Sequence, residues 1–188
     1  MVKDQRVFEQ WFQKMDSKRK EKILQCKKEE DKLRSLLAGV LFNFGLENNR
    51  NAKQIFYSIS HSGDYVICVL ADRSVGVDIE NSFRTLFQEE KKDQRNRIAK
   101  KCFTMGESIE YYSRDEAEKI EYMLDLWTKK ESYSKAIGKG LGLDFSLIDT
   151  QEMDKNFWSG WLEKGYYCSL YVANGEFRDM KIQEVVSL

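Results

Sequence analysis

The chain has 188 residues and a mass of 22.2 kDa, and its 31 Lys and Arg residues balance 31 Asp and Glu residues. A net charge of zero argues against a general nucleic-acid-binding protein, and the longest apolar run, residues 65–71, is too short to span a membrane. Residues 1–4 carry no signal-peptide hydrophobic segment. The four cysteines are widely spaced and His61 is the only histidine, which excludes Cys-x-x-Cys zinc sites and sites with two imidazoles. We therefore expect a reduced, cytoplasmic protein that forms one globular unit.

The first predicted element is a long helix over residues 15–47, in which apolar side chains recur at three- and four-residue spacing towards the C-terminal end. A polar loop, residues 47–53, follows this helix. Three short extended runs come next, over residues 55–60, 65–71 and 75–80. Because only short turns separate them, they predict an antiparallel meander.

The second part of the chain repeats this order of elements. Residues 86–103 and 115–137 predict helices with a mixed loop between them, and the glycines at 138 and 140 end the second helix. The aromatic-rich tail predicts strands over residues 157–163, 166–173 and 180–186. The sequence therefore predicts an α+β protein whose two similar halves pack together.

Two acidic side chains stand two residues apart in the third predicted strand. Asp78 and Glu80 project to one face, while Val77 and Ile79 enter the core. Two carboxylates on one face repel each other unless a cation lies between them, and oxygen ligands without His or Cys suit Mg²⁺. The alternative is a half-exposed edge strand with two solvated acids.

The helix over residues 115–137 carries two charged groups on its apolar stripe. Ile120, Leu124 and Trp127 lead at helical spacing to Glu131 and Lys135. Charged groups on a buried stripe are costly unless they are paired or bind a ligand. The helix could therefore supply a third carboxylate, and the alternative is a surface ion pair.

Residues 58–63, Ser-Ile-Ser-His-Ser-Gly, form a polar cluster at the end of a predicted strand. Hydroxyls and backbone N–H groups of such a turn can hold phosphate, and His61 could add a donor. An ordinary serine-rich turn is the alternative. A Ser-His hydrolase lacks support, because no Gly-x-Ser-x-Gly nucleophile elbow is present.

Two further patterns favour structural roles. The segment Gly-Lys-Gly-Leu-Gly at residues 138–142 closes a helix and has no Ser or Thr after its lysine, so it predicts a helix C-cap and not a phosphate loop. The basic run over residues 18–28 is interleaved with acids, which is typical of a solvated helix face.

The combined order and spacing of these segments resembles the Sfp-type (surfactin-synthetase-activating) family of 4′-phosphopantetheinyl transferases. Ser-x-Ser-His-Ser-Gly is followed by Gly-Val-Asp-Ile-Glu and then by Trp-Thr-Lys-Lys-Glu-Ser-x-x-Lys-x-x-Gly-Lys-Gly-Leu. The resemblance extends over roughly residues 17–172. It implies a monomer of two pseudo-symmetric α/β halves, each a small antiparallel sheet packed on helices, with coenzyme A in the cleft between them.

The resemblance also implies an activity and roles for residues. Family enzymes transfer the phosphopantetheine arm of coenzyme A to a serine of an apo acyl- or peptidyl-carrier protein, and release adenosine 3′,5′-bisphosphate. Asp78, Glu80 and Glu131 would hold Mg²⁺, and Glu131 would be the base. The groups expected around coenzyme A are Lys135 and His61 at the pyrophosphate, Ser60, Ser35, Arg19 and Lys22 near the adenosine, and Lys130. Residues 1–76 would form the nucleotide side, and residues 77–188 would supply the metal site, the base and the carrier-docking surface.

Some features of the family are missing. The family usually has Asn at the position of Ser58, and a Gly-Lys-Pro motif for which Lys53 is the nearest counterpart here. The alternative among enzymes is the shorter, trimeric holo-acyl-carrier-protein synthase type. It is about half this length, so the length and the two-half layout of this chain argue against it. Two alternatives from other classes are a non-catalytic coenzyme A-binding module and an unrelated Mg²⁺-dependent phosphate-binding protein.

The resemblance places carrier docking in the second half of the chain. Residues 100–112 mix basic and apolar side chains suited to an acidic carrier helix, namely Lys101, Phe103, Met105, Ile109 and Tyr111. The end of a core-packing helix is the alternative for this segment.

Overall fold

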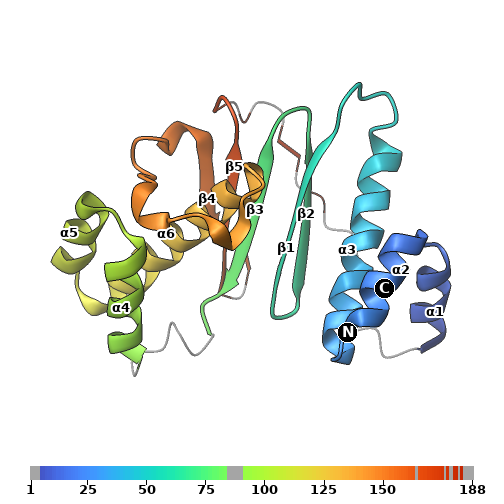
Figure 1. The fold of residues 1–188 in the computed structure, drawn as a ribbon, viewed down its shortest axis with the longest axis horizontal. Coiled ribbons are helices and arrows are strands. Elements are labelled where there is room, and N and C mark those ends of the chain that lie inside the picture. Colours follow the sequence, from blue (N-terminus) through green and yellow to red (C-terminus); the bar gives the residue numbers. More distant parts are fainter. Residues whose placement is uncertain are drawn as a thin grey trace.

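The computed structural model describes residues 5–83, 91–163, 165–175, 177, 180, 181 and 183 (Figure 1). Its helices are α1 (Gln5–Gln13), α2 (Ser17–Gln25), α3 (Glu29–Asn48), α4 (Lys92–Cys102), α5 (Met105–Ser113) and α6 (Glu116–Ala136). Its strands are β1 (Phe56–Ser62), β2 (Tyr65–Ala71), β3 (Val75–Asn81), β4 (Phe157–Trp161) and β5 (Tyr166–Val172). Short 3-10 turns are η3 (Gly140–Gly142), η4 (Phe145–Leu147) and η5 (Asp154–Asn156). The mixed architecture of two small antiparallel sheets packed on helices confirms the predicted fold class.

The N-terminal part is a cluster of three helices beside β2 (Figure 1). The single helix predicted over residues 15–47 is wrong, because the backbone is extended at Cys26 and divides it into α2 and α3. Asp16 starts α2 by accepting a hydrogen bond from the Arg19 N–H at 2.8 Å. α1 was not predicted from the sequence, and it places Phe8, Trp11 and Phe12 against the small core between these helices.

The strands form two separate sheets. β1 pairs with β2 in antiparallel fashion, and β3, β5 and β4 form the other sheet in that order. The predicted meander is therefore correct only for β1 and β2. β3 leaves β2 and pairs with β5 from the far end of the chain, so that β3 lies beside β1 in the middle of the molecule (Figure 1).

The second helical region differs from the prediction in two places. Of the helix predicted over residues 86–103, the described part is α4, and residues 86–90 lie outside the described residues. The predicted loop after it contains α5, which starts with a capping box between Thr104 and Glu107. The strand predicted over residues 180–186 lies mostly outside the described part of the chain.

α6 packs directly on β3 and β5, and this contact positions the candidate site (Figure 1). A Cβ atom on Gly76 would collide with the backbone carbonyl of Ser132, so the close approach requires glycine. The Thr128 and Ser169 hydroxyls hydrogen-bond at 2.6 Å, and the Ser74 hydroxyl donates to the Ala136 carbonyl at 2.6 Å. The helix ends at Ala136, and Gly138, which follows the cap residue Ile137 with a φ of 72°, fits the predicted glycine at the helix C-terminus.

Among the described helices, none combines the length and the apolar character that a membrane crossing would need.

Candidate active site

Alternate serines of β1 join the two sheets, and we call Ser58, Ser60 and Ser62 the serine seam. The Ser58 hydroxyl accepts a hydrogen bond from the Val77 N–H at 3.0 Å, and the Ser62 hydroxyl accepts one from the Asn81 N–H at 3.1 Å. All three serine side chains are buried. Because no β-ladder links β1 to β3 among the described strands, hydroxyls take the place of the backbone acceptors that a neighbouring strand would supply.

Asp78 lies at the centre of the site. Its Oδ1 atom accepts hydrogen bonds from the Ser60 hydroxyl at 2.9 Å and from the Lys135 ammonium at 2.7 Å. The Lys135 ammonium also donates to the Ser60 hydroxyl at 2.9 Å and to the Val77 carbonyl at 3.0 Å. Burial raises the pKa of the Asp78 carboxyl, and Lys135 opposes this shift. The structure thus joins two residues that are 57 positions apart in the chain.

Glu131 lies in the electrostatic field of the strand carboxylates. Burial raises the pKa of the Glu131 carboxyl, the charge of Asp78 raises it further, Lys135 opposes the shift and Glu80 adds to it. Glu80 itself accepts a hydrogen bond from the Ser62 hydroxyl at 3.2 Å. The charges of Asp78 and Glu80 thus act on the Glu131 carboxyl, and a metal site shared by the three acids stays a prediction.

The carboxylate oxygens of Asp78, Glu80 and Glu131 are of the type that divalent cations such as Mg²⁺ bind. The Oδ2 atom of Asp78 is buried without a hydrogen-bond partner, and a buried carboxylate oxygen in this condition is costly unless a ligand satisfies it. The described residues do not form a complete metal site, because no group of three His, Cys, Asp or Glu residues among them is placed to hold a metal ion. Instead, Lys135 supplies the positive charge beside Asp78.

His61 extends the site at the end of β1. Its side chain is exposed, and burial of part of the ring together with the charges of Arg34 and Lys135 lowers the pKa of its imidazole. The imidazole is therefore neutral at pH 7 and can act as a single N–H donor. Arg34 of α3 donates to the Gly63 carbonyl at 3.1 Å and pairs with Asp31 at 2.9 Å. Arg34 thereby fixes the turn that follows His61.

Of the residues expected near the adenosine, Ser35, Arg19 and Lys22 lie on the N-terminal helices, whereas Ser60 lies on β1 beside Asp78. The Ser35 hydroxyl of α3 is buried without a hydrogen-bond partner, which is uncommon for a buried polar group. The Arg19 side chain of α2 packs towards Gly39 of α3. Its positive charge acts to lower the pKa of the Cys68 thiol on β2, against the larger effect of burial. Lys22 is exposed on α2.

The prediction that Lys130 contacts coenzyme A is wrong, because the Lys130 side chain is 0% exposed. Its ammonium pairs with Glu107 at 2.7 Å and donates to the carbonyls of Phe145 and Ile148. Glu107 also accepts hydrogen bonds from the N–H and hydroxyl groups of Thr150. Lys130 therefore connects α5, α6 and the loop that follows α6.

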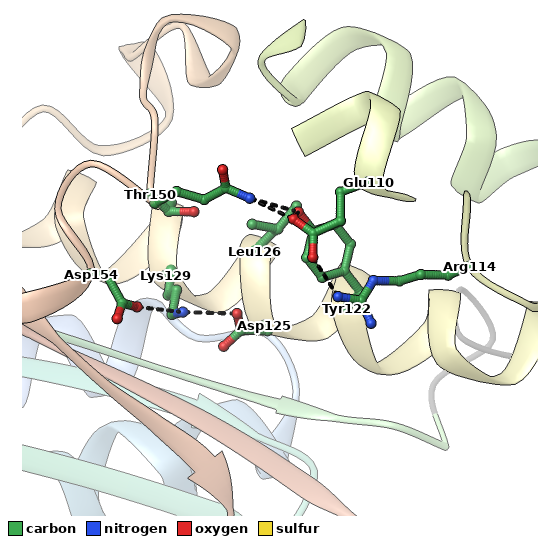
Figure 2. Close-up of a pocket in the computed structure, with 9 residues that line it drawn as sticks. Glu110, Arg114, Tyr122, Asp125, Leu126, Lys129, Thr150 and Asp154 are labelled. Atoms are coloured by element: carbon green, nitrogen blue, oxygen red, sulfur yellow. Dashed lines mark hydrogen bonds and ion pairs between the residues drawn. The ribbon is translucent and has the colours of Figure 1, made fainter. Parts of the chain in front are cut away.

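A polar pocket of about 260 Å³ lies elsewhere on α6 (Figure 2). It is lined by Glu110, Arg114, Tyr122, Asp125, Leu126, Lys129, Thr150, Gln151 and Asp154. Its charged groups are paired with one another: Glu110 accepts from Arg114 and Tyr122, and Lys129 lies between Asp125 and Asp154. None of the predicted site residues lines this pocket, so the candidate active site is a different region.

One residue of the candidate site, Ser62, was not predicted from the sequence. Ser62 was treated as part of a polar turn, but its hydroxyl contacts Glu80. The alternation of serine at positions 58, 60 and 62 contained the relevant pattern, because residues two apart in a strand share a face.

Comparison with known proteins shows which family the chain matches. Residues 74–181 match the model of the 4′-phosphopantetheinyl transferase superfamily, which is more than half of the chain. The match contains Asp78, Glu80, Glu131 and Lys135. The chain therefore belongs to the 4′-phosphopantetheinyl transferase superfamily.

Individual relatives carry related names. The chain is 37% identical over 87 residues to 4′-phosphopantetheinyl transferase Sfp of Bacillus subtilis, a match that covers 46% of this chain and 35% of that protein. It is 34% identical over 102 residues to 4′-phosphopantetheinyl transferase gsp of Aneurinibacillus migulanus, covering 54% and 38%. It is 27% identical over 113 residues to a holo-(acyl-carrier-protein) synthase of Geobacillus sp., covering 60% and 92%. The matched regions thus span little more than a third of the first two relatives.

Proposed function

We propose that this protein transfers the 4′-phosphopantetheine arm of coenzyme A to a serine of an apo acyl- or peptidyl-carrier protein and releases adenosine 3′,5′-bisphosphate. The observation that carries this proposal is the 2.7 Å ion pair between Lys135 of α6 and Asp78 of β3, which are far apart in the chain. Membership of the superfamily supports it. In this proposal, residues 1–76 form the side that binds the nucleotide of coenzyme A, and residues 77–188 form the catalytic side.

Glu131 is the base in this proposal. The serine oxygen of the carrier forms a bond to the β-phosphorus of coenzyme A, the bond from that phosphorus to the bridging oxygen breaks, and Glu131 accepts the serine proton. A raised pKa makes Glu131 a stronger proton acceptor than an ordinary carboxylate. Asp78, Glu80 and Glu131 would hold Mg²⁺, which when bound neutralises charge that develops on the phosphate oxygens.

Lys135 and His61 are assigned to the pyrophosphate. The Lys135 ammonium has three N–H donors, and these already serve Ser60, Val77 and Asp78. Lys135 must therefore exchange at least one of these partners for a phosphate oxygen. The neutral His61 ring can add an N–H hydrogen bond to the same group.

The adenosine end of coenzyme A is assigned to the N-terminal helices. Ser35 offers an unsatisfied hydroxyl, and Arg19 and Lys22 offer positive charge for the 3′-phosphate. Ser60 links this side to the carboxylates through its bond to Asp78.

The structure changes the expected carrier-docking surface. Phe103 and Tyr111 are 4% and 1% exposed, so they belong to the core and are unsuited to docking. Met105, Ile109 and Tyr112 of α5 are 82%, 64% and 49% exposed, and their spacing places them on one side of the helix. We assign carrier docking to these three residues, with the exposed lysines at the end of α4 as partners for acidic groups.

A transfer assay tests the proposed function. The protein is incubated with Mg²⁺, coenzyme A and a panel of apo carrier proteins, and intact-mass spectrometry looks for a phosphopantetheine adduct. We expect an adduct on at least one carrier. Absence of the adduct on every carrier, together with measurable coenzyme A binding, would favour a binding module instead.

The matched variant is Glu131→Gln, which keeps the size of the side chain and removes the base. We expect this variant to lose transfer while its affinity for coenzyme A stays within about tenfold, because the nucleotide binds mainly to other groups. Retained turnover in Glu131→Gln would remove Glu131 from the role of base.

A further inference from the structure

Ser62 has contacts that differ from those of the other seam serines. Its hydroxyl accepts the Asn81 N–H at 3.1 Å and lies 3.2 Å from the Oε2 atom of Glu80. Its side chain is 6% exposed, so water does not easily replace either partner. The two contacts thus act on adjacent residues at the end of β3.

The direction of each hydrogen bond follows from the chemistry of the groups. The Asn81 N–H can only donate, so the Ser62 oxygen is the acceptor in that contact. The one hydroxyl proton of Ser62 is then available to the Glu80 carboxylate, which can only accept when it is ionised. A hydrogen bond to a charged acceptor of this kind is stronger than one between neutral groups.

Ser58 provides an internal comparison. It occupies the same face of β1, it is also 6% exposed, and its hydroxyl accepts the Val77 N–H at 3.0 Å. The difference is the second contact, since the acid that Ser62 touches is a predicted metal ligand. Ser58 thus supports only the β3 backbone, whereas Ser62 supports the β3 backbone and also contacts Glu80; the third seam serine, Ser60, contacts Asp78.

We propose that Ser62 is a positioning residue that orients the Glu80 carboxylate for a divalent cation. This inference rests on the proposed function, since it takes Glu80 as a ligand. Outer hydrogen bonds to metal-ligating carboxylates fix their orientation, and their loss commonly weakens metal binding by about 10- to 100-fold. Ser62 acts through Glu80 and does not need to contact coenzyme A or the carrier.

The test measures binding of Mn²⁺ to the full chain by electron paramagnetic resonance, without a carrier protein. We expect Ser62→Ala to weaken Mn²⁺ binding by at least about tenfold and Ser62→Thr, which retains a hydroxyl, to restore most of it. Ser58→Ala is the matched control, and its Mn²⁺ affinity should stay within about twofold of the unmodified protein. In urea unfolding, Ser62→Ala should lose more stability than Ser58→Ala, because it removes the hydrogen bond to Glu80 as well as a contact to a β3 N–H group.

Asp78→Asn separates failure of this inference from failure of the proposed function. If Asp78→Asn loses Mn²⁺ binding and Ser62→Ala does not, the role of Ser62 is wrong and the metal site stands. If Ser62→Ala and Ser58→Ala weaken Mn²⁺ binding equally, Ser62 has only a structural role and the inference is overturned. If Mn²⁺ binding is the same in every variant, both the inference and the metal site of the proposed function are wrong.

Discussion

Lys130 and Lys135 are five residues apart on one helix and have opposite environments. Lys130 is fully buried with Glu107, whereas Lys135 reaches the strand carboxylates. Helical spacing explains the difference, because Lys130 follows Met123 and Leu126 by seven and four residues and both of those are buried. The same argument applied to the sequence would have placed Lys130 in the core.

Removing the buried cation should cost a large part of the stability. We expect Lys130→Met to lower the free energy of unfolding in urea by about 3 to 5 kcal/mol, because Glu107 is then left as an uncompensated buried charge. The double variant Glu107→Gln with Lys130→Met should lose less than Lys130→Met alone. Lys139→Met, at an exposed lysine, is the control and should change stability by less than about 0.5 kcal/mol. A Lys130→Met variant as stable as this control would contradict the structural role.

Single residues also show what the sequence could predict about the site. The two-residue spacing of Asp78 and Glu80 and the helical position of Glu131 predicted a cluster of three acids. The charges of both strand acids raise the pKa of the Glu131 carboxyl, and their joint binding of a metal ion stays a prediction. The ion pair between Lys135 and Asp78 was not predictable from spacing, because it depends on how closely α6 approaches β3.

At the scale of elements, Gly76 determines the approach of α6. Ser132 and Ala136 meet this position with backbone atoms, which cannot move aside as a flexible side chain would. Any larger residue at position 76 must therefore shift the helix away from β3. Such a shift would also move Lys135 away from Asp78, because both contacts belong to the same helix–strand pair.

We expect Gly76→Ala to lower the free energy of unfolding by about 2 kcal/mol or more, since the added methyl group overpacks a backbone contact. Gly160→Ala in β4 is the matched control, because the nearest atom to its new Cβ is 3.9 Å away. The control should change stability by less than about 0.5 kcal/mol in the same urea titration. Equal losses for the two variants would show that α6 does not pack tightly at Gly76.

The elements that were predicted well have strong local patterns. β1, β2, β3 and α6 agree with the prediction to within about two residues at each end. The break between α2 and α3 has no proline or glycine to mark it, and it arises because the two helices pack against each other. α5 was missed although Thr104 and Glu107 form the capping-box pattern that starts it.

At the scale of the whole molecule, the pairing of β3 with β5 could not be read from local sequence. About 90 residues separate these strands, and alternation of apolar residues does not identify a distant partner. The short turn after β2 favoured a local hairpin, but β3 turns away and completes the other sheet. The architecture was therefore predictable as a class, while the strand order was not.

The stability of the whole chain should fall at alkaline pH. Burial raises the pKa of the Cys168 thiol to about 12, whereas an unfolded thiol has a pKa of about 8.5. The folded state therefore retains a proton that the unfolded state releases, so this contribution is complete below pH 8.5 and is lost as the pH rises towards 12. Each such proton lowers the free energy of unfolding by up to about 1.4 kcal/mol per pH unit.

Urea unfolding between pH 9 and pH 10 measures this dependence. We expect Cys168→Ala to be less stable than the unmodified chain at pH 8 but to show a shallower decline with pH, because one linked proton has been removed. Identical slopes in the two proteins would mean that Cys168 does not retain its proton in the folded state.

The serine seam also has a mechanical consequence. Each sheet is held by continuous backbone ladders, whereas β1 and β3 are joined by side-chain hydroxyl contacts and apolar packing, with no ladder between them among the described strands. A stretching force applied across the two sheets would open this join before either sheet unravels. The molecule would then yield as two largely intact bodies, and the carboxylates along β3 would be parted from the hydroxyls that now hold them.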